Sequence, residues 1–419
     1  MLMALNNSIR FIDDKLYCDS IPAAAIAQDA GTPVYVYSLC RVLHNYQALQ
    51  SAFSDLDAHI HYSAKANANP AILRTLIEAG AGIDAVSAGE IFLALNVGVA
   101  PEKIVFAGVG KTADEIRYAI ERGVGWFNIE NAAECDVINT LAREFGRVQQ
   151  VALRLNPEVT ASTHAYIATG HGGAKFGLTA DAIRSLLDRQ AAFPHLTFAG
   201  LHVHIGSQLK EVNATVAGVE RALKLIEPYS GISVINIGGG FPAPYDQSRQ
   251  LPAPAEFAES LRSLLRGYQV LVEPGRSIVA DAGILITKLL YIKQHAGQTF
   301  YIVDASMTEL IRPALYRAVH QIVPLTRTGV DSTQTVQVVG PVCETTDVLG
   351  RDVALPELAE GDLLAILTTG AYGAVMSSNY NARPRPSEIA VDAAGTSWQT
   401  VRRRETFADL IARNMPLGT

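Results

Sequence analysis

The sequence predicts an α/β protein: a (β/α)8 TIM barrel with a second, C-terminal antiparallel β domain that also takes the N-terminal strands. From about residue 59 the chain repeats a short apolar strand followed by a helix-like segment, eight times in about 220 residues. The strands are apolar along nearly their whole length, as expected for parallel strands buried on both faces. After about residue 280 strands continue, but convincing helices become few.

The eight predicted barrel strands each end in small or polar residues. They are His59–Asn67, Gly82–Ser87, Lys103–Gly108, Gly125–Glu130, Val148–Pro157, Leu196–Ser207, Ser233–Gly240 and Gln269–Arg276. Helix-like segments such as Pro70–Ala79, Ala113–Arg122 and Val212–Ile226 separate most of them. Alternating strands and helices predict parallel βαβ units. A doubly wound sheet is the structural rival, but it rarely repeats the unit so evenly.

The chain is expected to divide into three segments. Residues 1–38 carry N-terminal strands that join the β domain, residues 39–279 form the barrel, and residues 280–419 form the C-terminal β-sandwich or barrel domain. Strands of that domain are expected at 284–292, 299–306, 335–343 and 363–373, with turn signals such as residues 327–332 between them. The N-terminal strands are expected at 9–18 and 33–38.

Composition excludes several classes of protein. The chain has 419 residues, of which 49% are hydrophobic and 18% charged, so it is neither disordered nor a disulfide miniprotein. A net charge of -7 without a basic cluster argues against nucleic-acid and membrane-surface partners. Four scattered cysteines favour a reducing cytoplasm. Residues 1–14 do not resemble a signal peptide, so we expect a cytoplasmic protein.

Lys65 closes the first barrel strand, and functional residues of such barrels lie where strands end. One interpretation is a lysine whose amine extends out of the barrel mouth to water. The other is an amine of lowered pKa that forms a Schiff base with a carbonyl compound. Position alone does not separate these two interpretations.

Three further strand ends carry polar or glycine-rich sequences. The seventh ends in Gly238-Gly239-Gly240, which is either a tight turn or a backbone cradle for an anion. The eighth ends in Glu273-Pro-Gly-Arg276, which is either an ion pair or two ligand-binding charges. The sixth contains His202-Val-His204, which would suit zinc only with further histidines at other strand ends. None is present, so no metal is expected and a histidine stacked on a flat ligand fits better.

These strand ends together describe a site for pyridoxal 5'-phosphate. A lysine could hold its aldehyde, a histidine its flat ring, a glycine turn its phosphate and a carboxylate its pyridine nitrogen. The sequence also resembles the fold type III pyridoxal-phosphate-dependent decarboxylases, which act on ornithine, lysine, arginine or diaminopimelate, and within them the diaminopimelate decarboxylases. The matching stretches are YSAKAN, DAVSAGE, LRLNPEV, ATGHGGAKFG, LHVHIGSQL, NIGGGFP, EPGRSIVADAG, LIRPALY, GPVCETTD and GAYG.

The resemblance assigns roles to individual residues. It implies that Lys65, His204 and Cys343 are catalytic, with Lys65 joined to the cofactor, His204 packed on its ring and Cys343 supplying a proton. The implied cofactor contacts are Lys65, His204, Ser207, Gly239, Gly240, Glu273, Gly275, Arg276 and Tyr372. The implied substrate contacts are Arg276, Arg312, Tyr316, Glu344 and Tyr372. It further implies a homodimer with shared active sites, in which the partner subunit lends Cys343 and Glu344.

The resemblance implies decarboxylation of meso-2,6-diaminopimelate to L-lysine and CO2 in lysine biosynthesis. Glu273 keeps the pyridine nitrogen protonated and so favours decarboxylation over racemisation. The chain departs from the usual family pattern at Ser306, at Thr308-Glu309 and at Thr345. A related amino acid with a carboxylate-bearing tail therefore stays an alternative substrate. An alanine-racemase-like enzyme and a non-catalytic cofactor-binding relative are two further alternatives.

Overall fold

The computed structural model describes residues 5–159, 175–245, 250–327 and 332–414. The predicted turn at 327–332 and the motif ATGHGGAKFG at 168–177 fall largely outside these ranges. The chain forms two compact units. The β unit comprises Met1–Leu43, Pro244–Gln250 and Val279–Thr419, and the barrel unit comprises His44–Ala243 and Leu251–Ile278.

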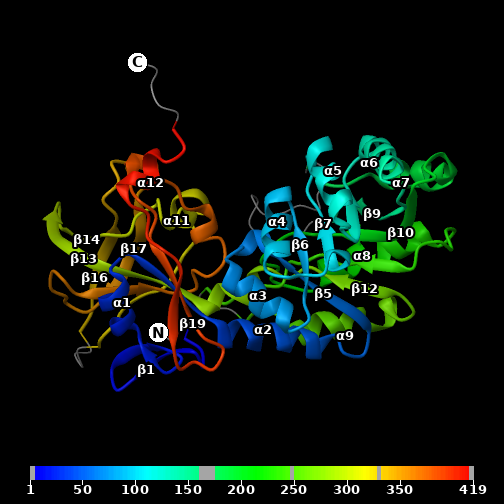
Figure 1. The fold of residues 1–419 in the computed structure, drawn as a ribbon. Coiled ribbons are helices and arrows are strands. Elements are labelled where there is room, and N and C mark those ends of the chain that lie inside the picture. Colours follow the sequence, from blue (N-terminus) through cyan, green and yellow to red (C-terminus); the bar gives the residue numbers. More distant parts are fainter. Residues whose placement is uncertain (1–4, 160–174, 246–249, 328–331, 415–419) are drawn as a thin grey trace, which may run out of the picture. The chain divides into compact units, whose positions relative to one another are not determined.

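The barrel unit contains a closed barrel of eight parallel strands, which confirms the predicted barrel (Figure 1). In chain order the strands are β5 (Asp57–Ser63), β6 (Gly82–Ala85), β7 (Ile104–Phe106), β8 (Trp126–Ile129), β9 (Gln149–Leu155), β10 (Leu196–Val203), β11 (Val234–Asn236) and β12 (Gln269–Val272). Neighbours in the chain are neighbours in the barrel, and β12 closes it against β5. All eight carboxyl ends therefore meet at one rim.

Helices follow the strands as the βαβ pattern requires. They are α3 (Pro70–Glu78), α4 (Ala88–Asn96), α5 (Ala113–Arg122), α6 (Ala132–Glu144), α7 (Ala180–Asp188), α8 (Asn213–Ile226) and α9 (Pro254–Leu265), with α2 (Leu39–Ala52) before β5 and α10 (Arg276–Val279) after β12. Local sequence sets their ends. In α5, Thr112 and Glu115 form a capping box, and Gly123 ends the helix in the left-handed conformation.

The β unit contains a large mixed sheet and a small antiparallel one. The small sheet is β1 (Ile9–Ile12), β2 (Lys15–Cys18) and β3 (Ile21–Pro22). The large sheet is β4 (Val34–Ser38), β13 (Gly283–His295), β14 (Gln298–Val303), β15 (Ile322–Pro324), β16 (Gln334–Val339), β17 (Val348–Leu355), β18 (Leu363–Ile366), β19 (Ser387–Val391) and β20 (Trp398–Arg402). Helices α1 (Ala23–Ala30), α11 (Arg312–Tyr316) and α12 (Phe407–Ile411) complete the unit.

The N-terminal strands do join this β unit, as expected. Strand β4 lies between β13 and β19 in the large sheet. Most pairs are antiparallel, but β4 with β19 and β14 with β16 are parallel. The sheet is therefore mixed, because these strands are brought together by long connections rather than by hairpins.

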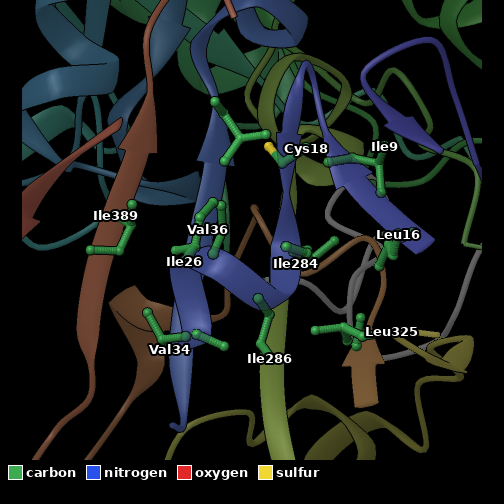
Figure 2. Packing of buried hydrophobic residues seen from close by; sticks show 14 of the residues in the cluster. Ile9, Leu16, Cys18, Ile26, Val34, Val36, Ile284, Ile286, Leu325 and Ile389 are labelled. Carbon is green, nitrogen blue, oxygen red and sulfur yellow. The ribbon is translucent and has the colours of Figure 1, made fainter. Parts of the chain in front are cut away.

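One apolar core unites the N-terminal and C-terminal parts of the β unit. Figure 2 shows Ile9 and Leu16 from the small sheet close to Ile284 and Ile286 of β13. Ile26 of α1 belongs to the same cluster and is fully buried. Burial of such side chains typically contributes about 1.5–3 kcal/mol each, so the small sheet is held mainly by this core. None of the helices in the described ranges combines the length and hydrophobicity needed to cross a membrane.

Candidate active site

Lys65 and Asp84 lie at the carboxyl ends of two neighbouring barrel strands. Lys65 is in the short turn Ala64–Ala66 after β5, and its Nζ is 3.1 Å from Oδ2 of Asp84 on β6. The same oxygen accepts a 2.6 Å hydrogen bond from Oγ of Ser63. Burial raises the pKa of Asp84, and the negative charge of Glu273 adds to the rise, whereas Lys65 opposes it. The buried carboxylate thus holds the amine at the barrel rim.

Glu273 follows β12 and is a buried acid of the barrel. Its Oε1 accepts hydrogen bonds from Nδ2 of Asn128 at 3.0 Å and from Nδ2 of Asn236 at 2.6 Å. Its Oε2 lies 3.4 Å from Nε2 of His202. Burial acts to raise the pKa of Glu273, but interactions with His202, Lys65 and Asn236 outweigh it and hold that pKa well below its usual value. Glu273 is therefore an ionised carboxylate that can pair with a proton-bearing nitrogen.

The two histidines of the His-x-His motif have different surroundings. Nε2 of His202 faces Oε2 of Glu273, whereas its Nδ1 has no hydrogen-bond partner in the part of the chain that the structure describes. Nδ1 of His204 accepts a 3.1 Å hydrogen bond from the N–H of Gly239. Burial lowers the pKa of His204 well below its ordinary value, and the positive charges of Arg154 and Lys65 lower it further. His204 is therefore neutral, with its proton on Nε2, and offers an uncharged flat ring.

The described ranges contain no group of three or more His, Cys, Asp or Glu side chains that could hold a metal ion. The nearest acid to His202 is Glu273, whose carboxylate already accepts hydrogen bonds from two asparagine amides. His204 is turned toward the backbone of Gly239. The two histidine rings of the motif therefore contact different partners and do not point toward a common metal position.

The turn after β11 requires glycine at three consecutive positions. Gly238 and Gly240 have φ of +64° and +102°, which favours glycine. A Cβ on Gly239 would lie 2.3 Å from the carbonyl oxygen of Glu273. A Cβ on Gly240 would lie 2.7 Å from Cδ1 of Leu209. The backbone can therefore approach the neighbouring strand ends and a ligand closely.

Arg276 and Ser207 supply polar donors to the barrel rim. Nε and Nη2 of Arg276, which is 7% exposed, donate to Oγ of Ser207 at 3.2 and 3.0 Å. A Cβ on the preceding Gly275 would lie 2.9 Å from Cβ of Ser63 and 3.0 Å from Cβ of Ala66. The absence of a side chain at Gly275 therefore lets the end of β12 approach the Lys65 turn. A guanidinium and a hydroxyl together are donors suited to a phosphate.

The barrel residues fit pyridoxal phosphate group by group. The amine of Lys65 suits the aldehyde, and the neutral ring of His204 suits the flat face of the cofactor. The ionised Glu273 suits a protonated pyridine nitrogen. The glycine turn and Arg276 suit the phosphate, since a Cβ at Gly239 would fill the approach. The barrel unit thus carries every group that the sequence predicts for this cofactor except Tyr372.

Arg312 begins α11 in the β unit and is also buried. Its Nε donates to Nε2 of His320 at 3.2 Å, and its Cζ lies 4.7 Å from the centre of the Tyr245 ring. Nδ1 of His320 is 3.0 Å from the carbonyl oxygen of Leu367. Tyr316, four residues after Arg312, is half-buried at the end of the same helix. Arg312 is therefore held by its own unit rather than lying on the surface.

Cys343 and Glu344 lie on an exposed loop between β16 and β17. The backbone N–H of Cys343 donates to Oδ1 of Asn381 at 3.0 Å, and the hydroxyl of Tyr380 donates to Oε2 of Glu344 at 3.4 Å. Tyr372 is half-buried in the loop after β18, with a left-handed φ of 57°. The loop backbone is thus fixed while both side chains face outward.

The family departures at Ser306 and Thr308-Glu309 form a closed hydrogen-bonded cluster. Oε2 of Glu309 accepts from the N–H and the Oγ of Ser306 at 2.7 and 2.8 Å, and Oε1 accepts from Oγ1 of Thr308 at 2.9 Å. Asp347 links this turn to the Cys343 loop by accepting from the N–H of Met307 at 2.6 Å. These substitutions satisfy one another inside the β unit.

Several residues of the site were not singled out from the sequence. They are Asp84, Asn128, Asn236, Tyr245 and His320. The first three are buried polar residues within apolar barrel strands, and that contrast is the signal that could have found them. Tyr245 and His320 carry no local signal, because they meet Arg312 only through the fold.

Comparison with known proteins places this geometry in a family. Residues 39–280 match the model of the "Pyridoxal-dependent decarboxylase, pyridoxal binding domain" family. A diaminopimelate decarboxylase of Aquifex aeolicus is 38% identical over 423 residues, covering 100% of both proteins. That of Vibrio cholerae is 41% identical over 407 residues, covering 96% of each.

Solved structures agree with the sequences. The structure of diaminopimelate decarboxylase from M. jannaschii in complex with L-lysine has a TM-score of 0.92 at 34% identity and covers 99% of both chains. That from Helicobacter pylori, also with L-lysine, has a TM-score of 0.88 at 35% identity and covers 93% of this chain and 98% of that one. The chain belongs to the pyridoxal-dependent decarboxylases and, among them, to the diaminopimelate decarboxylase family.

Proposed function

We propose that this chain decarboxylates meso-2,6-diaminopimelate to L-lysine and CO2, with pyridoxal phosphate as cofactor. One observation carries the proposal: Lys65 and the ionised Glu273 occur at the strand ends of one barrel, in a chain similar over its whole length to diaminopimelate decarboxylases. The lysine suits the aldehyde and the carboxylate suits the ring nitrogen. L-lysine, the product, is present in two of the similar structures.

Each part of the cofactor would be held by particular residues. Lys65 would bind its aldehyde carbon, His204 would cover its ring and Glu273 would pair with its ring nitrogen. The phosphate would be held by residues with donors or with no side chain, namely Ser207, Gly239, Gly240, Gly275, Arg276 and Tyr372. Because the N–H of Gly239 already donates to His204, the part of Gly239 is to allow close approach. Bound pyridoxal phosphate supplies an electron sink for the electron pair that CO2 leaves behind.

The protein groups then control charge and protons. Glu273, ionised and held by two amides, would keep a proton on the ring nitrogen of the bound cofactor. When the carbon–carbon bond breaks, CO2 leaves without the bonding electrons. Sγ of Cys343 would supply the proton that this carbon takes up in place of CO2, and water would reprotonate the thiolate. Because its pKa is held low, a neutral His204 would pack on the cofactor ring without competing for the proton.

Substrate choice follows from the two charges at the far end of diaminopimelate. Arg276, Arg312 and Tyr316 would donate to the tail carboxylate, and arginine suits it because a guanidinium can donate two parallel hydrogen bonds. Glu344 would pair with the tail ammonium. Tyr372 would contact both the substrate and the cofactor phosphate. Ornithine and lysine lack this second carboxylate at the tail, so they would offer these arginines no carboxylate to bind.

We further propose a homodimer in which each subunit lends Cys343 and Glu344 to the other. The exposure of both residues on a loop with a fixed backbone supports this arrangement, because a group lent to a partner must lie outside its own fold. A cytoplasmic location is proposed as well. It is supported by four cysteines without a disulfide in the described residues, which is usual in a reducing compartment.

A substrate panel on the purified holoenzyme tests the function. CO2 release would be measured with meso-diaminopimelate, L-lysine, L-ornithine and amino acids with other carboxylate-bearing tails. We expect kcat/KM for diaminopimelate to exceed that for L-lysine at least about 100-fold, since L-lysine bound as a substrate brings no tail carboxylate to the buried Arg312. Faster release from another tail-carboxylate amino acid would transfer the assignment to that substrate. Racemisation of alanine without CO2 release would contradict it altogether.

A further inference from the structure

His320 is held in a single protonation form by its two hydrogen bonds. Its Nε2 is 3.2 Å from Nε of Arg312, and its Nδ1 is 3.0 Å from the carbonyl oxygen of Leu367. A guanidinium only donates, so Nε2 must be the acceptor; a carbonyl only accepts, so Nδ1 must carry the proton. The geometry therefore requires a neutral imidazole with the proton on Nδ1.

The ring of Tyr245 packs against the same guanidinium. Its ring centre lies 4.7 Å from Cζ of Arg312. The ring of His320 meets the Tyr245 ring edge-on, with centroids 5.2 Å apart and planes at 85°. Arg312 and His320 are only 7% and 3% exposed. A hydrogen bond and a cation–π contact thus restrict the movement of the Arg312 head group.

We propose that His320, assisted by Tyr245, is a positioning residue that orients Arg312 toward the tail carboxylate of the substrate and so sets the preference for substrates that carry one. The proposal rests on the substrate role given to Arg312 above. Two parallel hydrogen bonds to a carboxylate require the guanidinium in one plane. An arginine whose head group is already held by its neighbours loses less side-chain freedom on binding than a mobile one. His320 itself does not touch the substrate.

Two ligands of equal chain length isolate this effect. L-lysine keeps the carboxylate that stands at the tail of diaminopimelate, whereas cadaverine has the same two amines and no carboxylate. The ratio of their inhibition constants on the holoenzyme therefore measures recognition of that carboxylate alone. It is independent of the chemical step, because neither ligand needs to be decarboxylated.

The test variant is His320→Leu, which removes the acceptor for Nε of Arg312. We expect inhibition by L-lysine to weaken at least about fivefold, as for loss of one hydrogen bond to a charged group. Inhibition by cadaverine should stay within about twofold of the original value, because cadaverine has no carboxylate for Arg312 to bind. KM for diaminopimelate should rise with most of kcat retained, and the absorbance of the bound cofactor should not change.

Two further variants exclude a merely structural effect. His320→Gln supplies an amide oxygen that can accept from Arg312, so it should restore much of the lysine preference. His61→Gln is the matched control, because His61 is also buried but bonds the carbonyl oxygen of Lys103 in the barrel. That control should leave the lysine-to-cadaverine ratio unchanged. A change in the ratio with His61→Gln equal to that with His320→Leu would count against the proposal.

Arg312→Leu separates this proposal from the proposed function. If Arg312→Leu abolishes the preference for L-lysine and His320→Leu does not reduce it, the positioning role is wrong and the function stands. If Arg312→Leu leaves the preference intact, the substrate role of Arg312 is itself wrong. Should His320→Leu fail to fold, Tyr245→Leu carries the test, and a folded Tyr245→Leu enzyme with an unchanged ratio would overturn the proposal.

Discussion

Asn236 donates a 2.6 Å hydrogen bond to Oε1 of Glu273, and both residues are buried at the ends of adjacent barrel strands. Asn128 donates to the same oxygen from β8, which lies across the barrel from β12. The two amides satisfy one carboxylate oxygen, while the other oxygen lies 3.4 Å from Nε2 of His202. The carboxylate is thus oriented as well as ionised, which is the property needed to hold a protonated ring nitrogen.

Replacing Glu273 by glutamine should impair the chemistry without removing the cofactor. Glu273→Gln keeps the shape but loses the negative charge, so the ring nitrogen would no longer be held protonated. We expect kcat to fall at least about 100-fold, within the range for loss of proton control in catalysis. The visible absorbance of the cofactor should persist. Steady-state kinetics and spectra on the same sample would check this, and an unchanged kcat would remove Glu273 from its role.

Adding one methyl group at Gly239 should disrupt the glycine turn. A Cβ there would lie 2.3 Å from the carbonyl oxygen of Glu273, whereas a Cβ on Gly231 meets nothing within 4 Å. Gly239→Ala should therefore cost about 1–3 kcal/mol of unfolding free energy and weaken cofactor binding. Gly231→Ala should change stability by less than about 0.5 kcal/mol. Thermal melts and cofactor titrations measure both, and equal behaviour of the two variants would refute the close approach.

Glu90 should make stability depend on pH. Its Oε2 accepts from the N–H of Val86 at 2.8 Å, and burial raises the pKa of Glu90 to about 7. An unfolded glutamate titrates near about 4.3, so the folded protein holds a proton that the unfolded chain has released between these values. This contribution to stability is therefore present at low pH and is lost as the pH rises toward 7.

Glu90→Gln removes that titration while keeping an oxygen for Val86. We expect its Tm to exceed that of the original protein by roughly 2–4 °C at pH 8, where ionised Glu90 destabilises the fold. The difference should be small at pH 4. Thermal unfolding at the two pH values provides the comparison. A difference that is the same at both pH values would show that Glu90 does not titrate as described.

Hybrid dimers test whether the active site is shared. Lys65→Ala and Cys343→Ala should each be nearly inactive alone. In a mixed dimer one site would regain an intact Lys65 and an intact Cys343, while the other would lack both. Random mixing makes half of the dimers hybrid, so about a quarter of the original activity should return. If subunit exchange is confirmed by mass spectrometry and activity stays absent, the site is not shared.

Much of this architecture could be predicted from the sequence, because it depends on local patterns. The eight apolar strands follow from short apolar runs that recur along the chain. The positions of Lys65, Glu273 and the glycine turn follow from the small and polar residues that end these runs. Asp84 illustrates the limit. It becomes the partner of Lys65 only through the register of β5 on β6, which sets Ser63 opposite Asp84. Register within a barrel is a property of the closed sheet and not of either strand alone.

The β unit depends even more on distant contacts. Strand β4 pairs with β13 and β19, which lie more than two hundred residues further along the chain. No local pattern reports such pairings, and therefore the parallel pairs in this sheet could not be anticipated. His320 was not identified from the sequence for the same reason, since its proposed role depends on contacts with Arg312 and Tyr245. Residues that position others can be identified only from their contacts in the structure, whereas the residues proposed for the chemistry could be identified from their places at strand ends.

The central claim is that Lys65 carries pyridoxal phosphate. Reduction of the holoenzyme with borohydride, followed by peptide mass mapping, would locate the cofactor on the chain. The account predicts the added mass on the peptide that contains Lys65, and no added mass in the Lys65→Ala variant. The control variant Lys103→Ala, which changes an exposed lysine, should be labelled like the original protein. Labelling of a different lysine in the original protein, or retention of the label in Lys65→Ala, would contradict it.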